Sequence, residues 1–494
     1  MYVRPLIALI AAHKAFGDLH GCLPAPRLQN QRPFGVDRLE QIFRANTESR
    51  LMGLFLFHFR QTGWTLEQVF LGVPAFGTVD PANIEAILSS NFKGWFRNPG
   101  LQQNGSKSQA SGGVVDLQPL FFQLTLEVTT SFLFGELIES LKAREGPGHQ
   151  TFADAFDHTS GGAVDLQPLF FQLTLEVTAS FLFGESIESL KAREGPGHQT
   201  FADAFNTAQD YVARRFRLLD LYWLIGGKDF RIACETVHSF ADKIIDRNLS
   251  HEMTEGEDGQ YFFLQAMARK TPNRTTLRSQ IINVLTAGRD TTACLLSWTF
   301  FLLIRHPRVL ENLRAEVSNI NSNTGLTRNS LRNMKYLQNV LKETLRLYPP
   351  VPVNARTAIC TTILPTGGGP DSTSPVLIPE DSSVAYSVYT MHRRPDLYGM
   401  DAELFRPERW DEQMPLNQNE TNSKWGYLPF NGGPRICLGM DFALSEAAYT
   451  VVRIIQKFPT IRLPEGEPVE LVGVEKQKIT MVMSITGGCN VELR

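Results

Sequence analysis

The sequence predicts a mainly α-helical chain with a small β-rich lobe near its N-terminus. Helical patterns cover Tyr211–Asn248, Thr275–His306 and Met440–Gln456, and Pro307 ends the second of them. A strand pattern over Thr65–Val73 predicts the β-rich lobe. With 494 residues the chain is long enough to bury a large core.

Composition excludes several classes of protein. The 48 basic and 51 acidic residues give a net charge of −3, so no nucleic-acid-binding surface is expected. The six cysteines are too dispersed for a disulfide scaffold and fit a reducing compartment. Residues 1–19 form a short apolar N-terminus, because the run Leu6–Ala12 is far below the about 20 residues that span a bilayer. A secretory signal is not expected either.

The first elements read as a hairpin followed by a helix. The apolar run Leu51–Phe59 is separated by a turn from Thr65–Val73, and we expect the two to pair as strands. Asp80 and Pro81 are suited to the N-cap and the first position of a helix over Ala82–Ser89.

A linker and a tandem repeat interrupt the chain before the long helices. Residues 97–113 carry almost no apolar side chains and predict an exposed linker. Ser111–Phe156 then recurs as Ser160–Phe205 with three differences, but two copies do not make a solenoid. We therefore expect a recent duplication or a misassembled gene model. Each copy holds one helical stretch, and we expect the second, Val164–Phe183, to occupy the native position and the first to be an insert or a replacement.

The loop from Phe430 to Gly439 contains Cys437 among turn-forming residues. Glycines permit a sharp turn around the sulfur, and Pro434 stiffens the approach. The helix that follows and Arg435 both favour thiolate over thiol. A lone cysteine is more often a buried apolar filler than a ligand, so these local features leave both the filler and the metal-binding thiolate open.

Two further patterns have both a structural and a functional interpretation. Gly288, in the middle of the helix over Thr275–His306, costs about 1 kcal/mol in helix propensity and would let a planar ligand approach the backbone. A tolerated glycine with Thr291 bonding its own backbone is the alternative. Glu343 and Arg346 are neighbours on one helix face, which by default indicates a surface ion pair.

The spacing Phe-x-x-Gly-x-Arg-x-Cys-x-Gly resembles the haem-ligand loop of the cytochrome P-450 family, the haem-thiolate monooxygenases. Its fixed positions here are Phe430, Gly433, Arg435, Cys437 and Gly439. The resemblance implies a single catalytic domain over residues 20–494 with the cytochrome P-450 fold. It also implies that the cofactor is haem b, with Cys437 as the axial ligand of the iron.

The same resemblance assigns roles to other residues. Asp290 and Thr291 would be the acid–alcohol pair that supplies protons during oxygen activation. Glu343 and Arg346 would form a clamp with Arg409 that holds the cysteine loop. Arg356 lies where the family places a cationic partner for a haem propionate.

One family feature is missing from the sequence. A helix with the pattern Trp-x-x-x-Arg should grip a haem propionate, but Trp95 is followed by Arg97 at the wrong spacing. We therefore expect a fold that lacks this helix and carries a duplicated helical segment.

The implied activity is hydroxylation of an aliphatic C–H bond with O2 and electrons from NADPH. A flavoprotein reductase would deliver the electrons. Stretches such as Phe34–Leu39 and Met391–Arg394 resemble the fungal alkane and fatty-acid hydroxylases, so the expected substrate is a long-chain alkane, a fatty acid or a fatty-acyl chain. A fungal secondary metabolite is the alternative substrate, and a haem-poor inactive protein is the alternative of another class. The family implies the cytosolic face of the endoplasmic reticulum membrane, with residues 1–19 as a truncated anchor or an interfacial segment.

Overall fold

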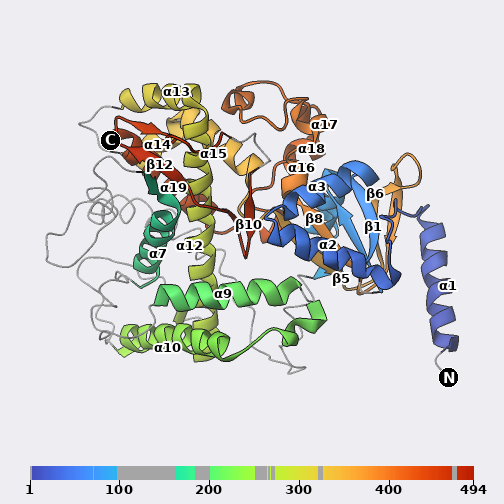
Figure 1. The fold of residues 1–494 in the computed structure, drawn as a ribbon. Helices are drawn as coiled ribbons and strands as arrows, with labels where there is room; N and C mark the ends of the chain where they lie inside the picture. The colour runs from blue at the N-terminus through green and yellow to red at the C-terminus, as the bar shows by residue number, and fades with distance from the viewer. Residues whose placement is uncertain are drawn as a thin grey trace. The chain divides into compact units, whose positions relative to one another are not determined.

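The computed structural model describes residues 3–70, 72–96, 163–183, 201–217, 219–250, 264, 267, 268, 273–320, 326–469 and 475–494. These residues fall into two compact units (Figure 1). The first comprises Met1–Gln109, Glu343–Cys437 and Glu470–Ile479, and the second comprises Ala110–Lys342, Leu438–Val469 and Thr480–Arg494. The linker 97–113 and the first repeat copy lie outside the described residues.

The first unit is built around a mixed five-stranded sheet of order β1-β2-β8-β5-β3. β2 pairs antiparallel with β1 and parallel with β8, and β5 pairs antiparallel with both β8 and β3. The antiparallel pair β6 and β7 forms a second small sheet. The strands of this unit are β1 (Thr65–Phe70), β2 (Val73–Thr78), β3 (Trp95–Phe96), β5 (Val353–Ala358), β6 (Thr362–Gly368), β7 (Ser374–Ile378), β8 (Ser383–Ser387) and β10 (Gln477–Ile479).

Short helices and helical turns connect and cover these strands. Asp80 caps α4, accepting from the Ala82 N–H at 2.9 Å, and Pro81 is the first helical residue, so this predicted helix start is confirmed. The helical elements are α1 (Val3–Leu19), η1 (Pro33–Gly35), α2 (Val36–Thr47), α3 (Leu51–Thr62), α4 (Pro81–Glu85), η2 (Ala86–Ser90), η3 (Phe92–Gly94), α16 (Val388–Met391), α17 (Pro395–Tyr398), η6 (Pro407–Asp411), η7 (Pro415–Gln418), α18 (Glu420–Trp425) and η8 (Gly433–Arg435).

The predicted first hairpin is wrong in one of its two strands. Leu51–Thr62 is the helix α3, whereas Thr65–Phe70 is the strand β1 and pairs with β2. The buried residues of α3 are Leu51, Met52, His58 and Phe59. This spacing of seven residues is two helical turns, so the apolar run buries one helical stripe.

The second unit is helical, with one small sheet of order β4-β12-β9. The predicted helix over Thr275–His306 is confirmed as α12, which Asn273 caps by accepting from the Thr276 N–H at 2.9 Å. The predicted pattern over Tyr211–Asn248 is divided between α9 and α10. The elements are β4 (Ala163–Asp165), α7 (Leu166–Phe183), α9 (Phe201–Arg217), η5 (Leu219–Leu224), α10 (Lys228–Ser250), α12 (Arg274–Arg305), α13 (Pro307–Ser318), α14 (Arg328–Asn333), α15 (Lys335–Leu347, which continues into the first unit), α19 (Met440–Lys457), β9 (Ile461–Arg462), β11 (Met483–Ile485) and β12 (Asn490–Leu493).

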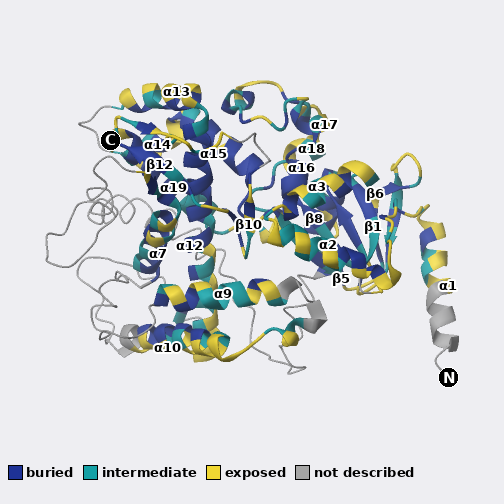
Figure 2. Ribbon diagram, viewed as in Figure 1, coloured by how far each residue is buried: buried dark blue, intermediate teal, exposed yellow. Residues whose placement is uncertain are grey.

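Burial differs along α12 (Figure 2). Every residue from Thr292 to Ile304 is buried, whereas Asn283 and Ala287 in the preceding turns are exposed. Helix α7, from the second repeat copy, packs along α12, and buried residues of both helices belong to one apolar cluster. In the described part of the chain, no helix is both long enough and apolar enough to cross a bilayer.

Candidate active site

The cysteine loop of the first unit folds back on itself through two backbone hydrogen bonds. The Cys437 N–H donates to the Phe430 carbonyl at 2.9 Å, and the Ile436 N–H donates to the Gly433 carbonyl at 3.1 Å. Cys437 is exposed at the end of this loop, directly before α19. The loop therefore presents a thiol that a ligand can reach.

Two glycines let the loop lie against its neighbours. Gly433 has a φ of +62°, and a Cβ there would lie 2.1 Å from the Leu88 carbonyl oxygen. A Cβ on Gly432 would lie 2.7 Å from the Trp425 ring. Beside Gly439, in contrast, a Cβ would have no heavy atom within 4 Å. The loop is thus packed closely at Gly432 and Gly433 and open at Gly439.

The residues of this loop fit a haem. Among the residues that the structure describes, His, Cys, Asp and Glu side chains form no cluster of three or more that could hold a metal ion. Cys437 itself is a free, exposed cysteine, and its sulfur is the kind of soft donor that can bind haem iron as an axial ligand. The backbone at Gly439, two residues after the cysteine, is uncrowded.

A polar chain joins the predicted propionate partner to the cysteine loop. Arg356 in β5 is buried, and its guanidinium carbon lies 5.7 Å from the centre of the Tyr386 ring. The Tyr386 hydroxyl donates to Asn431 Oδ1 at 3.0 Å, and Asn431 Nδ2 donates to the Arg435 carbonyl at 3.0 Å. Sequence reasoning missed Tyr386 and Asn431. Asn431 has a φ of +62°, a conformation that asparagine tolerates better than most residues.

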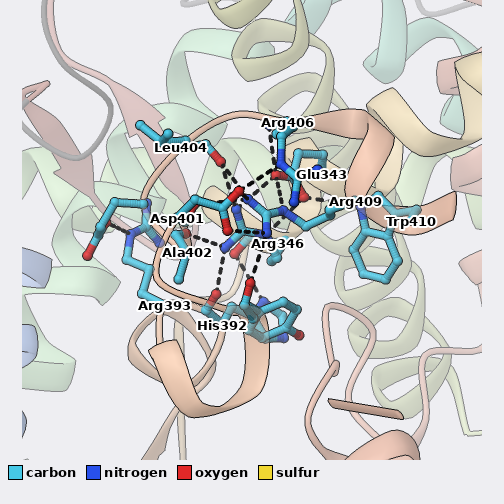
Figure 3. A network of polar contacts seen from close by, with 12 residues as sticks. Glu343, Arg346, His392, Arg393, Asp401, Ala402, Leu404, Arg406, Arg409 and Trp410 are labelled. Carbon is cyan, nitrogen blue, oxygen red and sulfur yellow. Dashed lines mark hydrogen bonds and ion pairs between the residues drawn. The ribbon is translucent and has the colours of Figure 1, made fainter. Parts of the chain in front are cut away.

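Glu343, Arg346 and Arg409 form the clamp that the family resemblance implies, and all three side chains are completely buried (Figure 3). Arg346 donates to both Glu343 oxygens at 2.9 Å, and Arg409 Nε donates to Oε1 at 2.8 Å. The Arg406 N–H and Trp410 Nε1 add hydrogen bonds of 3.0 and 3.1 Å. The default interpretation as a surface ion pair is therefore wrong, because the carboxylate is enclosed by five donor bonds.

Charge sets the protonation state of this carboxyl. Burial alone would raise the pKa of Glu343, but the guanidinium groups of Arg346 and Arg409 outweigh burial and hold the pKa below its usual range. Glu343 is thus ionised at neutral pH, and its negative charge is shared between two buried cations.

His392 connects the clamp to the segment that leads into the cysteine loop. Arg346 Nη1 donates to the His392 carbonyl at 2.7 Å, and the ring Nδ1 lies 3.1 Å from the Arg346 carbonyl. The Leu428 N–H donates to His392 Nε2 at 2.9 Å. Burial and the nearby Arg346 lower the pKa of His392 to about 3, so the ring stays neutral and Nε2 stays an acceptor. The sequence offered no signal for this role beyond the histidine itself.

In the second unit, α12 places the predicted proton-relay residues on different sides of the helix. Thr291 is partly buried and its hydroxyl donates to the Ala287 carbonyl at 2.7 Å. Asp290 is almost fully buried and accepts from Gln209 Nε2 of α9 at 2.5 Å. The two side chains thus have separate partners, a geometry that the sequence pattern did not indicate.

The predicted role of Gly288 is wrong. A Cβ on Gly288 would lie 2.6 Å from the Thr178 hydroxyl of α7. The glycine therefore permits close packing of α7 against α12 and does not open the backbone to a ligand. One turn earlier on α7, the Thr174 hydroxyl donates to the Arg289 carbonyl at 2.7 Å and fixes the same contact.

Burial controls the ionisation of two acids in this unit. Burial raises the pKa of Asp290, and the nearby Arg289 and the Gln209 hydrogen bond offset only part of this effect. Glu446 of α19 is completely buried, and burial raises its pKa well above the usual range, with the Thr292 hydroxyl opposing the shift. Burial therefore favours the protonated form of Glu446 over a wider pH range than in an exposed glutamate, a feature that sequence reasoning missed.

Known proteins resemble this chain over most of its length. The family model described as cytochrome P-450 matches residues 148–481. A cytochrome P-450 of Arthroderma benhamiae is 42% identical, over 97% of this chain and 93% of the relative. Cytochrome P-450 52A13 of Debaryomyces hansenii is 35% identical, over 94% of this chain and 92% of its own. Cytochrome P-450 52A3-A of Candida maltosa is 40% identical, over 83% of this chain and 69% of the relative.

Both the family match and these relatives cover most of the chain, and the fold is mainly helical with small sheets, as predicted. The family binds haem iron through a cysteine thiolate and catalyses monooxygenation. The chain belongs to the cytochrome P-450 family of haem-thiolate monooxygenases.

Proposed function

We propose that Cys437 is the axial thiolate of haem b in this chain. The observation that carries the proposal is the loop itself, which exposes the thiol, turns at glycines that contact Leu88 and Trp425, and is open beside Gly439. Phe430, Gly433, Arg435 and Gly439 shape this loop. The guanidinium group of Arg356 provides a cation for a propionate.

The proposed reaction inserts one oxygen atom of O2 into a C–H bond and releases the other as water. Two electrons from NADPH and two protons from solvent complete the balance. The bound haem supplies the oxygen activation, to which thiolate donation contributes. Asp290 and Thr291 would take part in the proton supply, because burial raises the pKa of the Asp290 carboxyl and the Thr291 hydroxyl can both accept and donate a proton.

The proposed substrate is a long-chain alkane, a fatty acid or a fatty-acyl chain. The likeness of Phe34–Leu39 and Met391–Arg394 to the fungal alkane and fatty-acid hydroxylases supports this class, as does the match to several relatives of the 52A group. A hydroxylase of a fungal secondary metabolite that carries such a chain is the alternative within the same chemistry.

The proposed partners are an NADPH-dependent flavoprotein reductase and a membrane surface on the cytosolic side of the endoplasmic reticulum. The partly apolar helix α1 supports membrane contact, as do exposed apolar side chains near the tip of the β1–β2 hairpin. These are Phe34, Val36 and Val73, of which Phe34 is 73% exposed. Burying such side chains in the lipid interface is favourable.

The carbon-monoxide difference spectrum of the reduced protein tests the haem assignment. Wild type and Cys360→Ala should both show the band of a thiolate-ligated haem, because Cys360 is an exposed cysteine elsewhere in the first unit. Cys437→Ala should lose that band. A haem-free wild type would favour the inactive alternative, and an unchanged band in Cys437→Ala would refute the ligand assignment.

Product analysis tests the substrate. Microsomes that contain the protein and a reductase are supplied with NADPH and with alkanes and fatty acids of graded length. Hydroxylated chains are the expected products. Failure at every length, in a preparation that shows the thiolate band, would remove the fatty-chain proposal and leave the secondary-metabolite alternative.

A further inference from the structure

Asp290 is a buried acid in the helical second unit, and its polar neighbours are Gln209 and Arg289. Gln209 Nε2 of α9 donates to Asp290 Oδ2 at 2.5 Å, and the carboxyl is almost completely buried. The second oxygen, Oδ1, lies 3.4 Å from Arg289 Nη1 and has no hydrogen-bond donor among the residues that the structure describes. Within the described part of the chain, the Gln209 amide therefore provides the one hydrogen bond to this carboxyl, beside the ion pair with Arg289.

This hydrogen bond directs Asp290 away from Thr291. Successive residues of an α-helix project about 100° apart, and the Thr291 hydroxyl is bonded to the carbonyl of the exposed Ala287. In this structure the Asp290 carboxyl is bonded to Gln209 and the Thr291 hydroxyl to Ala287, so the two side chains share no hydrogen bond.

Arg289 is held where it is by other contacts. Its guanidinium carbon lies 5.3 Å from the ring centres of both Phe171 and Phe205, and its carbonyl accepts from Thr174. The ionisable groups next to Asp290 are thus the guanidinium of Arg289 and, on the same helix, the thiol of Cys294, whose pKa is raised by burial. From α9 the facing group is the neutral Gln209 amide. This amide is the contact that a shift of α9 would break, because a hydrogen bond is lost beyond about 3.5 Å.

We propose that Gln209 is a positioning residue whose amide latches Asp290 in a resting orientation, and that turnover requires this latch to open so that the carboxyl can turn toward Thr291. The inference rests on the proposed role of Asp290 and Thr291 in proton supply. It adds a coupling between α9 and proton delivery. The Gln209 amide is a neutral donor and bonds the oxygen that does not face Arg289, so this bond is weaker than one from a charged donor.

Two substitutions change the latch in opposite directions. Gln209→Met keeps the length of the side chain and removes the donor, whereas Gln209→Lys replaces it with a charged donor. Asn206→Met is the matched control, because it places the same new side chain at an exposed position of α9. All are measured in the holoenzyme, after the thiolate band has confirmed haem loading.

Infrared spectroscopy follows the latch without relying on activity. The band of the protonated Asp290 carboxyl is assigned by its loss in Asp290→Asn, and its titration gives the pKa. A hydrogen bond to a charged group shifts a pKa by about one to two pH units, so Gln209→Met should raise the pKa of Asp290 by about that amount. Gln209→Lys should lower it, and Asn206→Met should leave it unchanged.

Coupling between NADPH oxidation and product formation is the second measurement. Gln209→Met should increase NADPH oxidation several-fold in the absence of substrate and lower the product formed per NADPH. Gln209→Lys should slow turnover while product per NADPH is maintained. Adding Gln209→Met to Asp290→Asn should change nothing further, because the latch acts through Asp290.

Two results would overturn the latch. The first is that Gln209→Met and Asn206→Met have the same Asp290 pKa and the same rate of NADPH oxidation without substrate. The second is that Gln209→Met still changes NADPH oxidation when Asp290 has already been replaced by Asn. Failure of the proposed function looks different, since the wild type itself would then lack the thiolate band or fail to oxidise NADPH.

Discussion

The buried clamp makes the sharpest prediction about stability. In Glu343→Gln, the side chain keeps its shape but loses the negative charge that faces Arg346 and Arg409, both completely buried. Five donors point at the two carboxylate oxygens, and an amide nitrogen cannot accept any of them.

The expected loss of stability follows from the two buried arginine charges that remain after the substitution. Breaking a buried ion pair by removing one partner costs about 3–5 kcal/mol, because the remaining charge is buried without compensation. Folded proteins have about 5–15 kcal/mol of stability, so this loss is a large share of the total. The clamp also reaches His392 and through it Leu428, so the cysteine loop should loosen at the same time.

Denaturant unfolding, followed by circular dichroism and by the thiolate absorption band, measures both effects. Glu343→Gln should lower the free energy of unfolding by about 3–5 kcal/mol and reduce haem retention. Glu420→Gln, which removes an exposed ion pair with Lys424, is the control and should change neither. If Glu343→Gln loses no more stability than Glu420→Gln, the structural role of the clamp is refuted.

The clamp also predicts a pH dependence. The pKa of Glu343 is lower in the folded chain than its ordinary value of 4.5. Its stabilising contribution is therefore complete above that ordinary value and is lost as the pH falls toward and through the folded pKa. The wild type should lose stability below about pH 4.5, and Glu343→Gln should lose less over the same interval.

Three further substitutions test separate features. Gly433→Ala should lower the free energy of unfolding by about 1–3 kcal/mol, because residue 433 has a positive φ and the new Cβ would clash with the Leu88 carbonyl. Gly439→Ala is the control and should leave the free energy of unfolding unchanged. The raised pKa of Glu446 makes its ionisation unfavourable in the folded chain, so the wild type should lose stability as the pH rises above about 4.5. Glu446→Gln should not show this loss, and an equally steep loss of stability in the variant would contradict the reasoning. Thr291→Val should retain the thiolate band but divert NADPH electrons from product to peroxide, which peroxide assays measure; unchanged coupling would exclude Thr291 from proton supply.

The sequence by itself determined the family and much of the local structure. Haem ligation through a cysteine needs a fixed short spacing, and Phe430–Gly439 carries all of it in one continuous segment. The cap at Asp80 and the helix over Thr275–His306 also depend on neighbours in the chain, so local patterns were sufficient to predict them.

Tertiary structure decided the features that depend on which face of an element is buried. A short apolar run fits a strand or a helix, and only packing made Leu51–Thr62 the helix α3. Gly288 proved to serve a helix contact because Thr178 lies opposite it. The direction of Asp290 depends on Gln209, which is 81 positions away in the sequence, and no local pattern can encode a contact between segments so far apart.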